Sequence, residues 1–93
     1  MRIIEIPEEL NTYIELLHYE VNALQDLLTR MATAQEEVPE SLCNYWTRQY
    51  IDKYTEYNIA KQNLEKDYVM PTLEEGEKVT WNLNFDSHEV VIQ

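Results

Sequence analysis

The chain has 93 residues, which is enough for one domain with a single modest core. It carries 18 Asp and Glu against 7 Lys and Arg, a net charge of −11, and such a charge disfavours direct contact with nucleic acid or an anionic membrane. We therefore predict one domain over 1–93 whose partners are proteins or peptides.

Cysteine content and apolar runs bear on the location of the protein. The single cysteine, Cys43, cannot form an internal disulfide, and we expect it to be buried or half-buried as a small apolar residue. The first residues lack the apolar run of about 7 to 15 residues found in signal peptides. No apolar run approaches the roughly 18 residues of a membrane span. We expect a cytoplasmic protein.

The first residues predict a strand followed by a helix. Residues 2–6 are rich in isoleucine and stand directly before a helix start, which is typical of a strand or an extended arm. Pro7 suits the first position of a helix, and Glu8 and Glu9 then lie in the first turn, where the helix dipole favours negative charge. The helix should begin near Pro7.

The apolar residues of this first helix form a heptad seam, on which the rest of the chain must pack. They recur at alternating steps of four and three, which indicates one buried helix face. A second line flanks the seam, so the apolar face is wide enough for two or more neighbours. The seam is Leu10, Ile14, Leu17, Val21, Leu24, Leu28 and Met31, and the flanking line is Tyr13, Leu16, Ala23, Leu27 and Ala34.

A second helix is expected after a short loop over 35–38. Pro39 and Glu40 repeat the entry signal, the helical pattern runs over 42–68, and Met70-Pro71 ends it, so the helix hairpin covers 7–69. Its stripe is mostly aromatic, and phenol rings suit either the edge of a core or an interface with a partner. Both interpretations stay open. The residues are Trp46, Tyr50, Tyr57, Ala60 and Leu64, with Tyr54 and Tyr68 beside them.

Beyond the polar connection at 72–77 the hydrophobic period changes to two. Alternating apolar residues flank the turn Asp86-Ser87, which predicts a β-hairpin over 78–92 with its aromatic face inward. Because a lone hairpin is marginal in water, it must pack on the helices or pair with 2–6 as a third strand. The predicted fold class is α+β: an antiparallel two-helix hairpin, then a β-hairpin, with an N-terminal third strand as an option.

No combination of residues indicates catalysis, and we expect neither enzyme activity nor a need for a metal or cofactor. Glu15-x-x-His18 has the spacing of di-iron helical bundles, but on the helix His18 lies at the boundary of the seam and Glu15 points to solvent. His88 is expected to be a polar turn residue. The acidic groups 36, 37 and 40, and 74, 75 and 77, are typical of solvated faces.

The aromatic helix and the closing hairpin resemble small bacterial accessory proteins encoded beside radical-SAM peptide-maturation enzymes, including the small partner of peptide spliceases. The resemblance implies a non-catalytic protein that binds a maturase, its precursor peptide, or both. It is carried by Tyr45-Trp46-x-x-x-Tyr50-x-x-x-Tyr54-x-x-Tyr57-x-x-Ala60-Lys61-x-x-Leu64-Glu65-x-x-Tyr68-Val69, and by Trp81-x-Leu83-Asn84-Phe85 followed by Glu89-Val90.

A competing hypothesis is a phage-type inhibitor whose carboxylates mimic nucleic-acid phosphates and block a nuclease, in the manner of anti-CRISPR proteins. Basic residues interrupt the acids on the second helix, which weakens that hypothesis. We predict a homodimer or an obligate complex, and strand addition by an extended peptide beside Trp81 and Phe85. Val91 would be an edge position if the second hairpin strand lies outermost. The predicted partner-binding residues are Trp46, Tyr50, Tyr54, Tyr57, Trp81, Phe85 and Val91.

Overall fold

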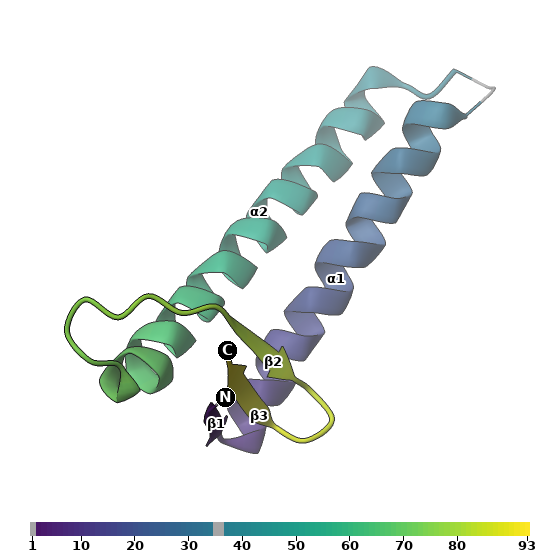
Figure 1. The fold of residues 1–93 in the computed structure, drawn as a ribbon. Helices are drawn as coiled ribbons and strands as arrows, with labels where there is room; N and C mark the ends of the chain where they lie inside the picture. The colour runs from purple at the N-terminus through teal and green to yellow at the C-terminus, as the bar shows by residue number, and fades with distance from the viewer. Residues whose placement is uncertain (1, 35–36) are drawn as a thin grey trace.

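The structure is a computed structural model that describes residues 2–34 and 37–93. Two long antiparallel helices, α1 (Glu8–Thr33) and α2 (Glu40–Leu64), form a hairpin, and a small sheet of β1 (Arg2–Glu5), β2 (Trp81–Asn84) and β3 (Glu89–Ile92) covers one end of it (Figure 1). The predicted α+β architecture, including the third strand from the N-terminus, is confirmed.

The helix boundaries follow the proline signals. Pro7 precedes α1 in extended geometry and Pro39 does the same for α2, with Glu8, Glu9 and Glu40 in the first turns. The second helix differs from the prediction at its other end. The backbone continues past Leu64 through a π-helical turn over Glu65–Val69 and a 3-10 turn over Met70–Thr72. Pro71 is accommodated there because it lies at the start of the 3-10 turn, where its missing N–H has no partner to lose.

The strand order is β1-β3-β2, and both pairings are antiparallel. The second hairpin strand is therefore the central one, and the prediction that Val91 lies at an edge is wrong. The physical reason is that β1 pairs with the side of β3 that the hairpin leaves open, with Ile3 opposite Val91. The two edges of the sheet are β1 and β2.

The core lies where the sheet meets the helices. Of the predicted seam, Ile14, Leu17 and Val21 are buried, whereas the members beyond them are half-buried. In the flanking line Tyr13 and Leu16 are exposed, so the apolar face is narrower than expected. Cys43 is half-buried, as predicted. The buried apolar residues are Ile6, Ile14, Leu17, Val21, Ala60, Leu64, Val69, Val90 and Ile92.

The hairpin turn and the long connection each use one left-handed residue. His88 ends the turn with φ of 56°, and its carbonyl accepts from the N–H of Ile6 at 3.0 Å. Gly76 has φ of 79° in the connection to β2. There Arg2 binds the Glu77 carboxylate, and this bond, with the N–H of Glu74, lowers the pKa of Glu77. The start of β1 is thereby fastened to the connection.

None of the described helices is long and apolar enough to cross a membrane.

The two acidic groups predicted to be solvated lie at opposite ends of the fold, one at the tip of the helix hairpin and one in the 72–77 connection. Of these acids Glu77 alone is recorded in an ion pair, and residues 35 and 36 lie outside the described residues.

Candidate functional site: the open edge of β2

The outer side of β2 carries backbone groups that no strand pairs. In an antiparallel pair, hydrogen-bonded and non-hydrogen-bonded residues alternate. Gln93 donates its N–H to the carbonyl of Thr80 at 2.9 Å, one residue beyond the Trp81–Ile92 pair. Asn82 and Asn84 therefore bond to β3, and the N–H and C=O of Trp81 and Leu83 point away from the sheet. These two residues form the open edge of β2.

A buried asparagine closes one end of this edge. Phe85 is the next residue whose backbone groups point outward. Its carbonyl accepts a hydrogen bond from Nδ2 of Asn11 at 3.0 Å. Asn11 lies in the first turns of α1 and is only 1% exposed, and its Oδ1 has no hydrogen-bond partner in the described structure. The bond to Phe85 supports the assigned alternation. It also fixes the hairpin turn against the start of α1.

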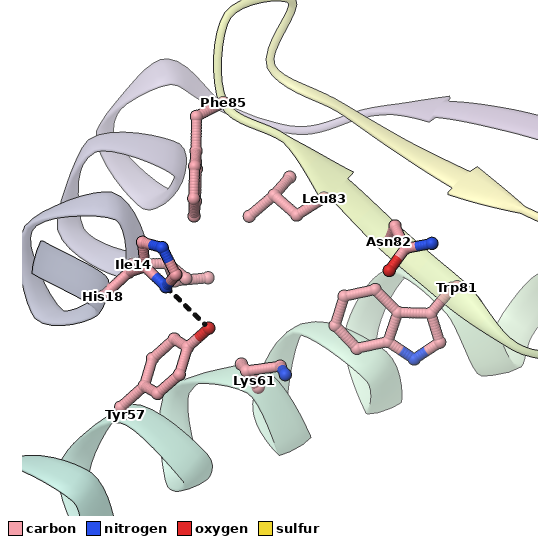
Figure 2. A pocket seen from close by; sticks show the side chains of 8 residues that line it. All are labelled: Ile14, His18, Tyr57, Lys61, Trp81, Asn82, Leu83 and Phe85. Atoms are coloured by element: carbon pink, nitrogen blue, oxygen red, sulfur yellow. Dashed lines mark hydrogen bonds between the residues drawn. The ribbon is translucent and has the colours of Figure 1, made fainter. Parts of the chain in front are cut away.

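A groove runs along the open edge, between β2 and the two helices. It encloses about 160 Å³, well below the roughly 300 to 1,000 Å³ of sites for small molecules and cofactors. That volume suits about one side chain. We call it the β2 groove, and its lining residues are Ile14 and His18 from α1, Tyr57 and Lys61 from α2, and Trp81, Asn82, Leu83 and Phe85 (Figure 2).

A hydrogen-bonded chain sets the polarity of one wall of the groove. Nδ2 of Asn22 lies 3.2 Å from Nε2 of His18. Nδ1 of His18 lies 3.4 Å from the hydroxyl of Tyr57 (Figure 2). Because an amide nitrogen can only donate, we assign Nε2 as the acceptor, and in the neutral ring Nδ1 then carries the proton. Nδ1 donates to the oxygen of Tyr57, which leaves the phenolic proton to donate elsewhere.

Tyr57 keeps that proton at neutral pH. Burial, and next the nearby Tyr54, raise the pKa of Tyr57 above its ordinary value of 10.0. The ring of His18 is packed among aromatic neighbours, with centroids 5.9 Å from Tyr57 and 5.5 Å from Phe85. The imidazole is thus held as part of an aromatic cluster, and the hydroxyl of Tyr57 is a fixed donor at the groove.

Lys61 supplies the positive charge of the groove. Its Nζ lies 5.2 Å from the centre of the Tyr57 ring and 5.8 Å from that of Trp81, within the range of cation–π attraction. The ion pairs found within the described residues involve Arg2, Arg30 and Lys53, and none of them includes Lys61. No carboxylate lines the groove.

The predicted site residues divide into three groups. Tyr57, Trp81 and Phe85 meet at the β2 groove. Trp46, Tyr50 and Tyr54 lie farther along α2, where Tyr50 and Tyr54 stack at 5.7 Å and Trp46 meets the edge of Tyr45 at 5.0 Å. Val91 lies half-buried on the central strand, outside the groove.

The site also contains residues that were not predicted to bind a partner. Lys61 and Asn82 line the groove and Asn11 holds the end of the open edge. Asn11 and Asn82 gave no periodic or motif signal, Lys61 entered only through the resemblance and as one of the basic residues of the second helix, and His18 was considered only as a metal ligand. Glu15 is half-buried rather than pointing to solvent. No three His, Cys, Asp or Glu side chains of the described residues gather in a way that could hold a metal ion.

Comparisons of the chain with protein-family models, with curated proteins and with solved structures found no match. The geometry of the groove and of the β2 edge is therefore the basis for assigning a function.

Proposed function

We propose that the protein is a non-catalytic module that binds an extended segment of a protein or peptide by strand addition to β2. The observation that carries this proposal is the pair of outward-pointing residues, Trp81 and Leu83, beside the β2 groove. Main-chain hydrogen bonds to these residues would supply affinity, and the groove would select one side chain of the segment.

The edge of β2 suits strand addition better than the edge of β1 does. Edge strands that must stay unpaired are commonly protected by charges, prolines, bulges or covering segments. On β1, Glu5 brings a charge, and Arg2 is bound to Thr72 and Glu77 of the connection. Trp81–Asn84 contains no charged residue and no proline.

The resemblance to accessory proteins of radical-SAM peptide maturation suggests the setting. We propose that the added strand belongs to a precursor peptide or to the maturase itself, and that the complex is cytoplasmic. The surface charge of −11 would draw in a segment with basic residues. In this setting the radical chemistry belongs to the maturase, and this chain is its companion.

We further propose that the protein functions as a homodimer or in an obligate complex. Exposed apolar side chains on both helices support this, notably Leu16 and Tyr19 on α1 and Tyr45 and Ile51 on α2, each more than half exposed. Sedimentation at micromolar concentration tests it. If the protein is instead a monomer that melts cooperatively without any partner, the helix surface is not an interface.

Selection of short linear peptides from a displayed library, followed by amide exchange on the complex, tests the strand-addition proposal. We expect the amides of Trp81 and Leu83 to become protected when a selected peptide binds. Methylating the peptide nitrogens at alternate positions gives a matched pair, of which one member should lose binding and the other keep it. The proposal would be contradicted if no peptide binds, if binding protects the amides of Ile3 and Glu5 instead, or if both methylated peptides lose affinity equally.

Salt dependence separates this function from phosphate mimicry. A peptide held mainly by backbone bonds should lose little affinity between about 50 and 300 mM salt. Steep loss of affinity for a nuclease, reproduced by reversing the charges of Glu74, Glu75 and Glu77, would favour the inhibitor. Val91→Pro does not serve as the diagnostic variant, because it would break the central strand.

A further inference from the structure

We infer that the β2 groove binds the carboxylate of an aspartate or glutamate side chain of the added segment. The inference deepens the proposed function and rests on it for the source of the carboxylate. A carboxylate fits because the polar groups at one end of the groove are donors: the ammonium of Lys61 and the hydroxyl of Tyr57. The aliphatic part of the same side chain would contact the apolar wall formed by Ile14, Leu83 and Trp81.

The charge of Lys61 is the central element of this argument. Within the described residues it makes no ion pair, and its contacts are the faces of Tyr57 and Trp81. Those rings orient the ammonium without neutralising it. A partly buried ammonium without a recorded counter-ion is complementary to an incoming carboxylate, and a charge-assisted hydrogen bond is stronger than a neutral one.

The negative charge of the whole protein does not oppose this binding strongly. Glu65, one helical turn from Lys61, and Asp86, next to Phe85, line neighbouring pockets, and neither is recorded in an ion pair with Lys61. Surface charges farther away than the Debye length, about 8 Å at physiological ionic strength, are largely screened. No carboxylate lines the groove. The preferred segment therefore combines one acidic residue at the groove with basic residues on either side, and this mixed pattern distinguishes it from a purely basic peptide.

Blocked amino acids test the groove separately from strand addition, because they are too short to form a strand. Acetyl-glutamate N-methylamide should shift the NMR signal of the Trp81 indole N–H in a saturable way. The glutamine analogue should bind about tenfold or more weakly, since it lacks the charge. Lys61→Met keeps the apolar stem and should abolish the preference for glutamate over glutamine, whereas Lys61→Arg should retain that preference. Lys66→Met, at an exposed position, is the matched control.

Several outcomes would overturn the inference. Equal binding of the glutamate and glutamine forms, tighter binding of acetyl-phenylalanine N-methylamide, or no saturable shift up to the solubility limit would each do so. Loss of binding in Lys66→Met as well as Lys61→Met would also contradict it. Tyr57→Phe keeps the ring and should weaken glutamate binding severalfold. If glutamate binds but the amides of Trp81 and Leu83 are never protected by a peptide, strand addition fails while the carboxylate site stands.

Discussion

The two ends of the helix hairpin differ in what covers them. At the sheet end, the seam of α1 meets α2 on one side and β2 and β3 on another, and all the buried apolar residues of the described chain except Val21 form one cluster there. At the other end, over 24–33 and 40–54, the helices pack only against each other, and no described side chain is fully buried.

This difference shows that two helices alone do not enclose a core. Each helix in the uncovered half leaves most of its circumference in water, and helices of this kind depend on tertiary packing for stability. Polar contacts link the helices at the border of this half, such as the half-exposed ion pair of Lys53 with Glu20 at 3.0 Å, but ion pairs near the surface contribute little. We therefore place folding stability at the sheet end. The uncovered half leaves apolar side chains such as Tyr45 and Ile51 exposed.

Truncating matched leucines of the same helix should reveal the difference most strongly. Leu17→Ala removes a side chain that is 2% exposed and should cost about 2 to 5 kcal/mol of unfolding free energy. Leu28→Ala should cost roughly half of that or less, because this side chain is half-buried and leaves no enclosed cavity. Urea unfolding measures both. Equal losses would mean that the uncovered end is packed as well as the sheet end.

Two asparagines of α1 give the next comparison. Asn11→Ala should cost about 1 to 3 kcal/mol, because it leaves the carbonyl of Phe85 without its donor at a part-buried position. Asn22→Ala removes an exposed bond to His18 and should change the unfolding free energy by less than about 0.5 kcal/mol. Thermal and urea unfolding test the pair. A comparable loss for both would remove Asn11 as the residue that fixes the hairpin to α1.

The turn of the β-hairpin tests whether backbone conformation contributes to the sheet end. His88→Val should cost about 1 to 2 kcal/mol, since a β-branched residue tolerates φ of 56° poorly. His88→Gly should be close to neutral, because glycine relieves the strain but gains freedom in the unfolded chain. Equal losses for the two variants, measured by urea unfolding, would indicate that the imidazole and not the backbone conformation matters at this position.

The features that were predicted correctly depend on short-range periodicity. The 3.6-residue period of α1 and the two-residue alternation over 79–92 are visible within single segments, and the prolines mark both helix starts. The order of the strands is not visible in that way, because the run Val90-Val91-Ile92 is apolar on both faces and fits a central or an outer strand equally. The placement of Val91 at an edge was wrong for this reason.

The groove was only partly predictable for a related reason. Tyr57, Trp81 and Phe85 were identified because aromatic residues are conspicuous in any pattern. Lys61 belongs to the groove through the distant Trp81 ring, and Asn11 belongs to the adjoining edge through Phe85, 74 positions away. A polar residue in a helix looks like a surface residue until the strand that it contacts has been placed.

The smallest expected effect concerns a repulsive pair within the sheet. Glu5 of β1 and Glu89 of β3 are directly opposite, and like charges at such positions destabilise an antiparallel pair. Glu89→Lys should therefore raise the unfolding free energy by about 0.2 to 1 kcal/mol. The gain should shrink at high salt, which screens exposed charges.

Glu75→Lys makes the same change in net charge in the exposed connection and is the matched control. If both variants stabilise equally, the gain comes from lowering the overall negative charge. If only Glu89→Lys stabilises, Glu5 and Glu89 repel each other locally in the sheet. β1 stays paired despite this repulsion because Arg2 and the connection hold it in place.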